Sequence, residues 1–409
     1  MANAKVKKKA KKLTMTPKHN FDTLPAEVFE AIAREAGPYD LLSLRLVNTE
    51  AAAKVFRVFI EVHIARRAFM LSSEDGLRGL LAIAENESLA QHVKQIVLCV
   101  DWVCQTSSDF FQCRFNRPQE PLHAGEHMQF LKAQRRFAKS RLDHLLLTAA
   151  FARFRQLGSS IEVLMAEVHE AIALDKANLR PLGLSTLGWA VVTQYHNRMI
   201  TSKTRGTQLA IDALALSNLQ PATFTIHESA EDGLDLERIV RDSVAMKNAK
   251  TVFSSVKRLH LQCYNPDGGI SQDQAEAILD MFAGSQTLEE LSWEPSTYCL
   301  FPCSIPPFDD DFSSQAGNPT LAKATLGARF PAVKHLKLSG FRFHWKEFVA
   351  FTRRQQKLEH LQMCHIGFES AGASNRMRMG EWSDEDLERR LKDSTGLKSI
   401  SLKRAKILS

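Results

Sequence analysis

The sequence has few of the features that a secreted or membrane protein would need. Its 409 residues include seven scattered cysteines and no C-x-x-C pair, so a disulfide framework is not expected. The N-terminus has no apolar stretch of the secretory kind, and no run is long and apolar enough to span a bilayer. These absences predict an intracellular protein, nuclear or cytoplasmic, with no membrane partner.

Positive charge is concentrated at one end of the chain. The formal net charge is +7, and residues 1–20 contain seven lysines and no acidic residue, so residues 21–409 are formally neutral. A nucleic-acid footprint needs basic residues clustered on the folded surface, and the overall charge therefore gives no reason to expect specific nucleic-acid binding. The lysine run KVKKKAKK (5–12) is either a nuclear localisation signal or part of a solvated, disordered tail.

Enzyme motifs are almost absent. The chain has no P-loop, no G-x-S-x-G and no dinucleotide fingerprint. His123, Glu126 and His127 spell the inverted zinc-protease motif H-x-x-E-H, but a proline precedes it, a glycine lies inside it and no third ligand is evident. The consecutive aspartates at 309–311 lack the alternating spacing of a cation loop. We expect no catalytic residue, metal or cofactor, and an enzyme built on H-x-x-E-H is the alternative.

The segment FDTLPAEVFEAIAREAGPYDLLSLRLVNTE, near the N-terminus, has the pattern of two short helices. Leu24, Val28 and Ile32 recur at i, i+4 and i+8, which puts them on one helix face. Pro25 suits the first helical position, a Gly-Pro pair ends the helix, and Asp40 is expected to cap the second helix. Apolar side chains lie on nearly every side of that second helix, so we expect a partner protein to cover it.

This segment, with FRVFIEVHI after it, resembles an F-box over residues 21–69. The family pattern is Leu-Pro-x-Glu, an apolar helix, a break, and then Asp-Leu-Leu-x-Leu-Arg-x-Val, which reads here LPAEVFEAIAREAGPYDLLSLRLV. The resemblance implies docking on the Skp-type adaptor of a cullin-containing ubiquitin ligase. The residues that it implies as adaptor contacts, or as their immediate support, are Leu24, Pro25, Ile32, Leu41, Leu44 and Val47.

A six-residue pattern recurs along the rest of the chain. Each copy reads apolar, charged, variable, apolar, variable, apolar, which is the L-x-x-L-x-L strand signature of leucine-rich repeats. The clear copies are VKQIVL (93–98), VKRLHL (256–261), LEELSW (288–293), VKHLKL (333–338), LEHLQM (358–363) and LKSISL (397–402), and weaker ones are IEVLMA (161–166) and ATFTIH (222–227). A stretch of helical period precedes most copies, and Ser73, Ser271 and Ser383 are suited to cap three of these helices.

The copies are unevenly spaced, mostly further apart than the roughly 20–29 residues of regular arrays, and the asparagine ladder of such arrays is missing. We therefore predict a mixed α/β protein, in which the F-box precedes an irregular leucine-rich-repeat-like solenoid over residues 70–409. Arrays of this kind often follow an F-box in fungal proteins. Insertions are expected near 105–141 and 295–320, and an ordinary α/β sheet domain is the alternative.

In such an array the apolar residues enter the core and the residues between them line one sheet face. That face either binds a protein substrate or is solvated without a ligand, and its cations and imidazoles would suit a phosphorylated substrate. Its predicted residues are Arg258, His260, Gln262, Glu290, His335, Lys337, His360, Gln362, Ser399 and Lys403. The hypothesis is a substrate-recognition subunit of a Skp–cullin–F-box ubiquitin ligase, which is not itself an enzyme. The alternative is a repeat scaffold that takes no part in ubiquitination.

Overall fold

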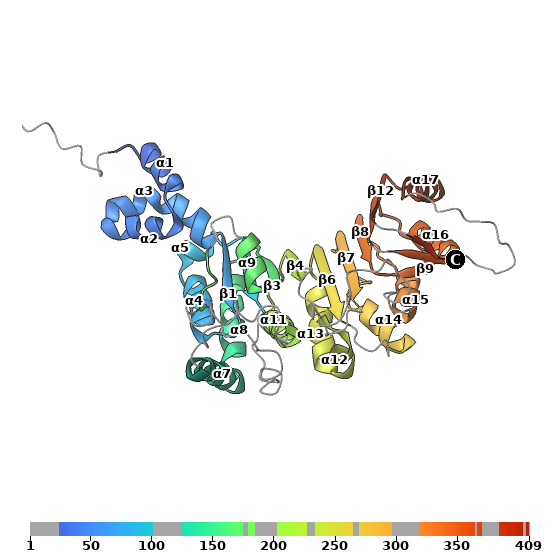
Figure 1. Cartoon of the computed structure of the whole chain (residues 1–409), viewed down its shortest axis with the longest axis horizontal. Coiled ribbons are helices and arrows are strands. Elements are labelled where there is room, and N and C mark those ends of the chain that lie inside the picture. Colours follow the sequence, from blue (N-terminus) through green and yellow to red (C-terminus); the bar gives the residue numbers. More distant parts are fainter. Residues whose placement is uncertain are drawn as a thin grey trace, which may run out of the picture. The chain divides into compact units, whose positions relative to one another are not determined.

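The computed structural model describes residues 24–100, 124–174, 179–184, 203–226, 234–264, 270–296, 319–364, 366–369, 384–403 and 406–408. The chain forms two compact units, Met1–His63 and Ile64–Ser409. The first is helical where it is described, and the second is built on a parallel β-sheet (Figure 1). Among the described helices, none has both the length and the apolar character needed to cross a membrane.

Three short helices make up the described part of the N-terminal unit. They are α1 (Ala26–Glu35), α2 (Pro38–Val47) and α3 (Thr49–Phe59), which continues into the π-helix η2 (Ile60–Ile64). Pro25 is the N-cap of α1, one position earlier than predicted. Gly37 is the N-cap of α2 and Pro38 its first residue, so Asp40 does not cap this helix as predicted. Asp40 lies in the first turn of α2, where its negative charge interacts favourably with the positive end of the helix dipole.

The second unit contains one long parallel sheet whose strands follow one another in chain order. Its path consists of β1 (Arg66–Met70), β2 (Gln95–Cys99), β3 (Glu162–Ala166), β4 (Thr223–Ile226), β6 (Arg258–Tyr264), β7 (Glu290–Ser296), β8 (His335–Ser339), β10 (His360–Cys364) and β12 (Ser399–Lys403). The two-residue strand β5 (Leu234–Asp235) pairs with the end of β6. All eight predicted strand positions are confirmed. The first strand, β1, was not predicted, and it begins within the last residues of the segment that resembles an F-box.

Helices connect these strands. They are α4 (Glu74–Glu85), α5 (Glu87–Ala90), α7 (Ala124–Lys139), α8 (Leu142–Gln156), α9 (Val168–Leu174), α11 (Lys203–Ser217), α12 (Leu236–Arg241), α13 (Ser243–Phe253), α14 (Gln272–Asp280), α15 (Pro319–Gly327), α16 (Trp345–Arg354) and α17 (Asp384–Thr395). Crossovers between parallel strands are almost always right-handed, so an unreversed strand order keeps most of the connecting helices on one face. Successive helices of this row contact one another, from α4 to α8, α11 and α13, and from α12 to α14, α15, α16 and α17 (Figure 1).

The strand order also bears on ligand binding. Doubly wound sheets bind ligands where their strand order reverses, because a crevice opens at that point. The described strands from β1 to β12 contain no such reversal. The described sheet therefore has no crevice of this kind. The surfaces that remain for binding are its open face and its helices.

The six clear copies of the repeat share one local geometry. Each enters its strand two residues after the start of the sequence pattern, because the first apolar residue is buried before the strand begins. Next to the buried Val256, the N–H groups of Lys257 and Arg258 both donate to the carbonyl of Ala222, at 3.2 and 3.4 Å. The same paired donation to one carbonyl recurs at Lys94 and Gln95, Glu289 and Glu290, Lys334 and His335, Glu359 and His360, and Lys398 and Ser399.

Two of the three predicted serine caps are confirmed. Ser73 caps α4, and its hydroxyl accepts the N–H of Gly76 at 3.4 Å. Ser271 caps α14 in a reciprocal capping box with Gln274. Ser383 lies outside the described residues. Of the predicted insertions, the first is helical from the start of α7 onward, and most of the second lies outside the described residues.

A second parallel sheet has three short strands, each of which comes shortly after one of the last three strands of the long sheet. Its order is β13 (Lys406–Leu408), β11 (Gly367–Glu369) and β9 (Arg342–His344). Aromatic rings support it: Phe343 stacks on Phe348 with ring centroids 5.0 Å apart, and Phe348 meets Phe368 edge-on at 5.4 Å. These strands were not predicted, because three residues carry too little periodicity to be recognised.

The first three strands of the long sheet are covered on both faces. On the face opposite the row of helices, α9 packs on an apolar cluster formed by Ala68, Met70, Val97, Cys99, Leu164, Ala166, Val168 and Ala171. Residues 179–184 cover the edge of β1, where the N–H of Leu182 donates to Ala68 at 2.8 Å and the N–H of Met70 donates to Leu182 at 2.9 Å. The open face of the sheet therefore begins beyond β3.

Candidate functional site

Helix α1 has one face in the core of the N-terminal unit and one in solvent. Phe29 and Ala33 are buried, and α1 packs on α3. Val28 and Ile32 are 44% and 39% exposed. The apolar stripe predicted from the spacing of Val28 and Ile32 is therefore the outer face of this helix.

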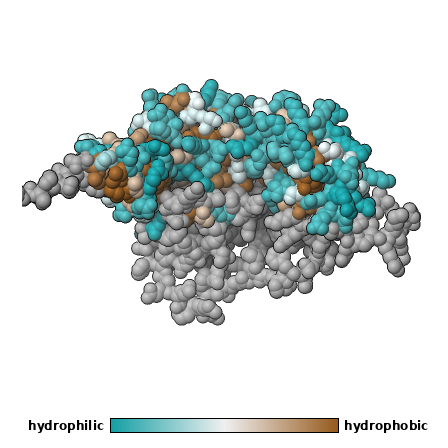
Figure 2. Space-filling model, turned by 90° about the horizontal axis from the view of Figure 1, so that it is seen from above, coloured by the Kyte–Doolittle hydropathy of each residue, from teal (hydrophilic) through white to brown (hydrophobic). Residues whose placement is uncertain are grey.

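Helix α2 continues this exposed apolar surface. Ten large apolar side chains are exposed among the described residues, and six of them belong to α1 and α2, namely Val28, Ile32, Tyr39, Leu42, Leu46 and Val47. We call these six residues the apolar helix surface. Apolar residues gather over this unit at the left of Figure 2. Exposed apolar patches of this kind mark interaction sites in soluble proteins.

The predicted adaptor residues divide into surface and support. Leu41 is 1% exposed, so it is a core residue that supports the surface and cannot itself contact a partner. It faces inward because α2 packs closely on α3. The other five reach solvent, with Pro25, Ile32 and Val47 exposed and Leu24 and Leu44 half-buried.

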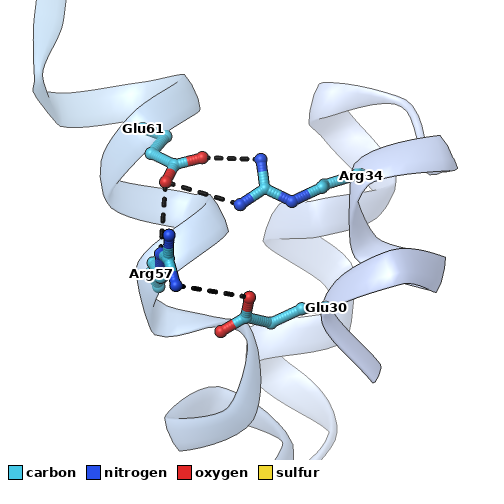
Figure 3. A network of polar contacts seen from close by, with 4 residues as sticks. All are labelled: Glu30, Arg34, Arg57 and Glu61. Atoms are coloured by element: carbon cyan, nitrogen blue, oxygen red, sulfur yellow. Dashed lines mark hydrogen bonds and ion pairs between the residues drawn. The ribbon is translucent and has the colours of Figure 1, made fainter. Parts of the chain in front are cut away.

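A network of four charged side chains joins α1 to α3 and η2 (Figure 3). Arg34 donates to both carboxylate oxygens of Glu61, at 2.8 and 3.4 Å. Arg57 donates to Glu61 at 3.4 Å and lies 4.0 Å from Glu30. The hydrogen bond from Arg34 lowers the pKa of Glu61, and the same bond raises the pKa of Arg34. Ion pairs this exposed add little stability, so their main effect is to orient α1 against α3.

Further contacts hold the ends of α1 and α2 in place. The ring of His63 stacks on Phe59, with centroids 5.0 Å apart, and its Nε2 donates to the carbonyl of Pro38 at 3.0 Å. The guanidinium of Arg45 lies 3.7 Å from the centre of the Phe59 ring. Lys54 donates to the carbonyl of Leu24 at 3.1 Å. The apolar helix surface is thus presented on helices that are fixed by contacts within their own unit.

The polar face of the long sheet brings together the predicted substrate-binding residues. The strand register aligns two rows across β6, β7, β8, β10 and β12, one formed by Arg258, Glu290, His335, His360 and Ser399, and the other by His260, Ser292, Lys337, Gln362 and Ser401. We call these two rows the polar sheet face. The alternate residues, such as Leu259, Leu291 and Leu336, are buried. Gln262 and Lys403 follow in the same strands, and the described side chains do not include theirs.

Carboxylates within the chain face the cations of this surface. Arg258 donates to Glu162 at 2.6 Å, and Glu162 also accepts a hydrogen bond from Gln95 at 3.1 Å. The Nε2 of His260 lies 3.5 Å from Glu290. The face is therefore of mixed charge, which removes the reason to expect a phosphorylated substrate there.

Two imidazoles lie at the centre of the polar sheet face. The rings of His335 and His360 stack with centroids 4.5 Å apart and planes 7° apart. The Nδ1 of His360 is 2.6 Å from the hydroxyl of Ser399. Hydrogen bonding and stacking, rather than net charge, are what this region offers to a partner.

Charges alternate along the edge where the strands begin. Lys257, Glu289, Lys334, Glu359 and Lys398 each precede a strand, and we call them the charge ladder. Lys334 pairs with Glu289 at 3.0 Å, and Lys398 pairs with Glu359 at 2.8 Å. Hydrogen bonds from these two lysines lower the pKa of both carboxyl groups. The alternation favours the observed register, because a slip of one strand along its neighbour would separate these opposite charges.

The other candidates for chemistry lie outside the described part of the molecule. His123 is outside the described residues, as are the side chains of Glu126 and His127 and the aspartates at 309–311. Among the described residues, no group of three or more His, Cys, Asp and Glu side chains is arranged to hold a metal ion.

Comparisons with known proteins add no family assignment. No model of a known protein family matches the chain, and a search of curated proteins gives no match. The F-box resemblance therefore rests on the residues of the N-terminal segment itself.

Proposed function

We propose that this protein is the substrate-recognition subunit of a Skp–cullin–F-box type ubiquitin ligase. The N-terminal unit is the F-box, and its apolar helix surface binds the Skp-type adaptor. The strand–helix array is an irregular, leucine-rich-repeat-like solenoid whose polar sheet face binds a protein substrate. Holding adaptor and substrate on one chain makes ubiquitin transfer effectively intramolecular, and the chain itself carries out no bond chemistry.

The observation that carries this proposal is the apolar helix surface. The unit already has a core of its own, which includes Phe29, Leu41 and Phe59, so the exposed side chains are not needed to fold it. Full burial of a large aliphatic side chain contributes roughly 1.5–3 kcal/mol. A partner that covers Leu46, Val47 and Ile32 would gain the share that is still exposed, which is 86%, 61% and 39% of these side chains.

The repeat interpretation is supported by three features of the second unit. Strand order follows chain order, the connecting helices contact one another in a row, and six copies enter their strands through the same paired hydrogen bonds. These features are expected when each unit buries its apolar face only against its neighbours.

Binding of purified Skp-type adaptor to matched valine variants tests the adaptor proposal. Val47 on α2 and Val244 on α13 are 61% and 63% exposed, so Val→Asp at either position leaves the core intact. Asp at the end of α2 also opposes the helix dipole, whereas Asp at the start of α13 does not, so circular dichroism of both variants must first show that the helices are retained. We expect calorimetry to show adaptor binding by the wild type and by Val244→Asp, and a loss of at least about tenfold for Val47→Asp, about 1.4 kcal/mol.

Two results would count against the adaptor proposal. The first is a wild-type chain that is folded by circular dichroism and binds no adaptor. This result would favour the alternative, a repeat scaffold that takes no part in ubiquitination. The second is equal binding by Val47→Asp and Val244→Asp, which would place the contact elsewhere on the chain.

A further inference from the structure

Helix α7 carries an exposed row of basic side chains. Lys132, Arg135, Arg136 and Lys139 recur at i, i+3, i+4 and i+7, so they lie on one side of the helix, and all four are exposed. Arg141 follows directly after the helix and is also exposed. We call these five residues the cationic stripe. The buried side of α7 contains Gln134 and Phe137, and the helix packs against α8.

The described part of the chain does not neutralise this stripe. None of its five side chains makes an ion pair or a hydrogen bond with the described part of the chain. Residues 132–156 include seven basic residues and a single acidic one, Asp143, which is buried and paired with Arg205 at 2.6 Å. Some exposed cations elsewhere face carboxylates, as Arg78 faces Glu74, whereas others, such as Lys247 and Lys250 on α13, make no ion pair with the described part of the chain. The stripe is distinct because its five cations lie together with no exposed acidic residue among residues 132–156.

Helix stability does not account for the stripe. Like charges at i and i+4, such as Lys132 with Arg136 and Arg135 with Lys139, destabilise a helix. The helix dipole favours only Arg136 and Lys139, which lie in the last turn. An anionic partner would offset the repulsion among all of these residues.

We infer that the cationic stripe binds the phosphate backbone of double-stranded nucleic acid without reading its sequence. Lys132 and Lys139 are separated by about 10 Å along the helix axis, at 1.5 Å per residue. Over that length a duplex presents about six negative charges, one per about 1.7 Å. An extended acidic polypeptide presents at most one charge per about 3.3 Å. Three of the five cations are arginines, whose planar fork suits phosphate oxygens.

The composition of the stripe argues against other anionic partners. The described exposed residues beside it are Gln129, Ala133 and Ser140, and none is an aromatic ring on which the bases of a single strand would stack. None is a large apolar side chain that could serve as the anchor of a protein interface or enter a membrane. The next exposed leucine along the chain is Leu145, in the first turn of α8, and it provides a way to detect an apolar contact. This inference does not depend on the ligase proposal.

The test measures binding of the full-length chain to a labelled 20-base-pair DNA duplex of arbitrary sequence. The binding constant K is determined from the fluorescence anisotropy of the duplex at several salt concentrations. Arg135→Glu/Arg136→Glu removes two stripe cations, and the control Lys247→Glu/Lys250→Glu makes the same charge change on exposed lysines of α13. The basic tail is present in every sample. We expect the slope of log K against log salt to become shallower by about 2 in the stripe variant and to stay unchanged in the control.

Two further variants control for charge reversal and for an apolar contact. Arg135→Gln/Arg136→Gln removes the charges without reversing them, and it should also make the salt slope shallower by about 2 while keeping the helical circular dichroism. Leu145→Ser should bind the duplex as the wild type does.

Four results would overturn the inference. One is an equal change of slope in the stripe variant and the α13 control, which would show that net charge alone matters. A second is loss of binding in Leu145→Ser, which would point to an apolar partner. A third is preference for a single strand of the same sequence. The fourth is a stripe variant that loses binding to phosphatidylserine vesicles while its duplex binding is unchanged.

Discussion

The two units of the chain differ in how they cover apolar side chains. The apolar helix surface exposes six large apolar residues between Val28 and Val47, whereas the whole described part of the second unit exposes four. In the second unit a row of helices covers one sheet face, and α9 covers the other face of the first three strands. The sheet unit therefore covers most of its own apolar side chains, while the short helices of the first unit leave a cluster of them exposed.

The largest expected effect comes from the same substitution in both units. Leu338 in β8 is fully buried, and Leu46 in α2 is 86% exposed. Leu338→Ala should lower the free energy of unfolding by about 2–5 kcal/mol, because it leaves a cavity. Leu46→Ala should change it by less than about 0.5 kcal/mol. Urea unfolding measures this difference with two probes. Tryptophan fluorescence follows the second unit, where the buried Trp293 pairs with Leu338 across the sheet, and far-UV circular dichroism follows the helices of the first unit, which has no tryptophan. A large loss from Leu46→Ala would mean that α2 is covered within the chain.

Sequence reasoning located the strands well because the repeat pattern reflects the sheet directly. Alternating burial, as at Leu259 and Leu261 in β6, is what a strand with one covered face requires. The strand starts were two residues early because the first apolar residue of each copy packs before the strand begins. Helices α8 and α11 were missed because apolar residues lie on several of their sides, which weakens the helical period.

The cover over β1 to β3 was also missed, although the sequence contains a signal for it. The strands QIVLC and EVLMA are apolar at almost every position, as expected for strands buried on both faces. No local pattern identifies α9 and residues 179–184 as the cover, because that pairing depends on contacts between distant segments.

A second prediction concerns residues 179–184, which cover the edge of β1. Gly183 has φ +84°, and a Cβ there would lie 2.4 Å from the backbone nitrogen of Gly76. Gly183→Ala should cost about 3 kcal/mol, from the left-handed backbone together with the clash. Gly158→Ala is the control, because φ there is +66° with no atom near the added Cβ, so it should cost only about 1–2 kcal/mol. Equal losses of thermal stability in the two variants would show that residues 179–184 do not hold the edge of β1.

The candidate site was predictable to different degrees in the two units. The rows of the polar sheet face follow from strand alternation, so Arg258, His335 and His360 could be placed together from sequence. Their carboxylate partners could not, because Glu162 lies on a strand far away in the chain. In the N-terminal unit, spacing on α1 identified Val28 and Ile32 as one face, but it could not show that this face points to solvent and that Phe29 fills the core.

The smallest expected effect lies in the charge ladder and depends on pH. The hydrogen bond from Lys398 lowers the pKa of Glu359 from its ordinary value of 4.5. A carboxyl group of this kind stabilises the fold above that ordinary value, and the stabilisation is lost as the pH falls through the lowered pKa. Glu359→Gln should therefore unfold at a slightly lower temperature than wild type at pH 7, and the difference should vanish in strong acid.

Lys398→Gln is the control for this prediction, because it removes the side chain that lowers the pKa of Glu359. In that background, adding Glu359→Gln should change the unfolding temperature less than it does in the wild type. A difference between wild type and Glu359→Gln that grows as the pH falls would contradict the role given to the charge ladder, and it would remove one reason why the sheet unit holds its register unaided.

Hydrogen exchange of the full-length chain, with and without purified Skp-type adaptor, tests the contrast between the two units most directly. If the first unit is completed by an adaptor, amides of α1 and α2 should exchange more slowly in its presence, because binding stabilises the helices that it covers. Amides of β6, β7, β8 and β10 should be unchanged. Unchanged exchange in α1 and α2 at saturating adaptor, or protection confined to the sheet unit, would contradict the proposal that the apolar helix surface is the adaptor site.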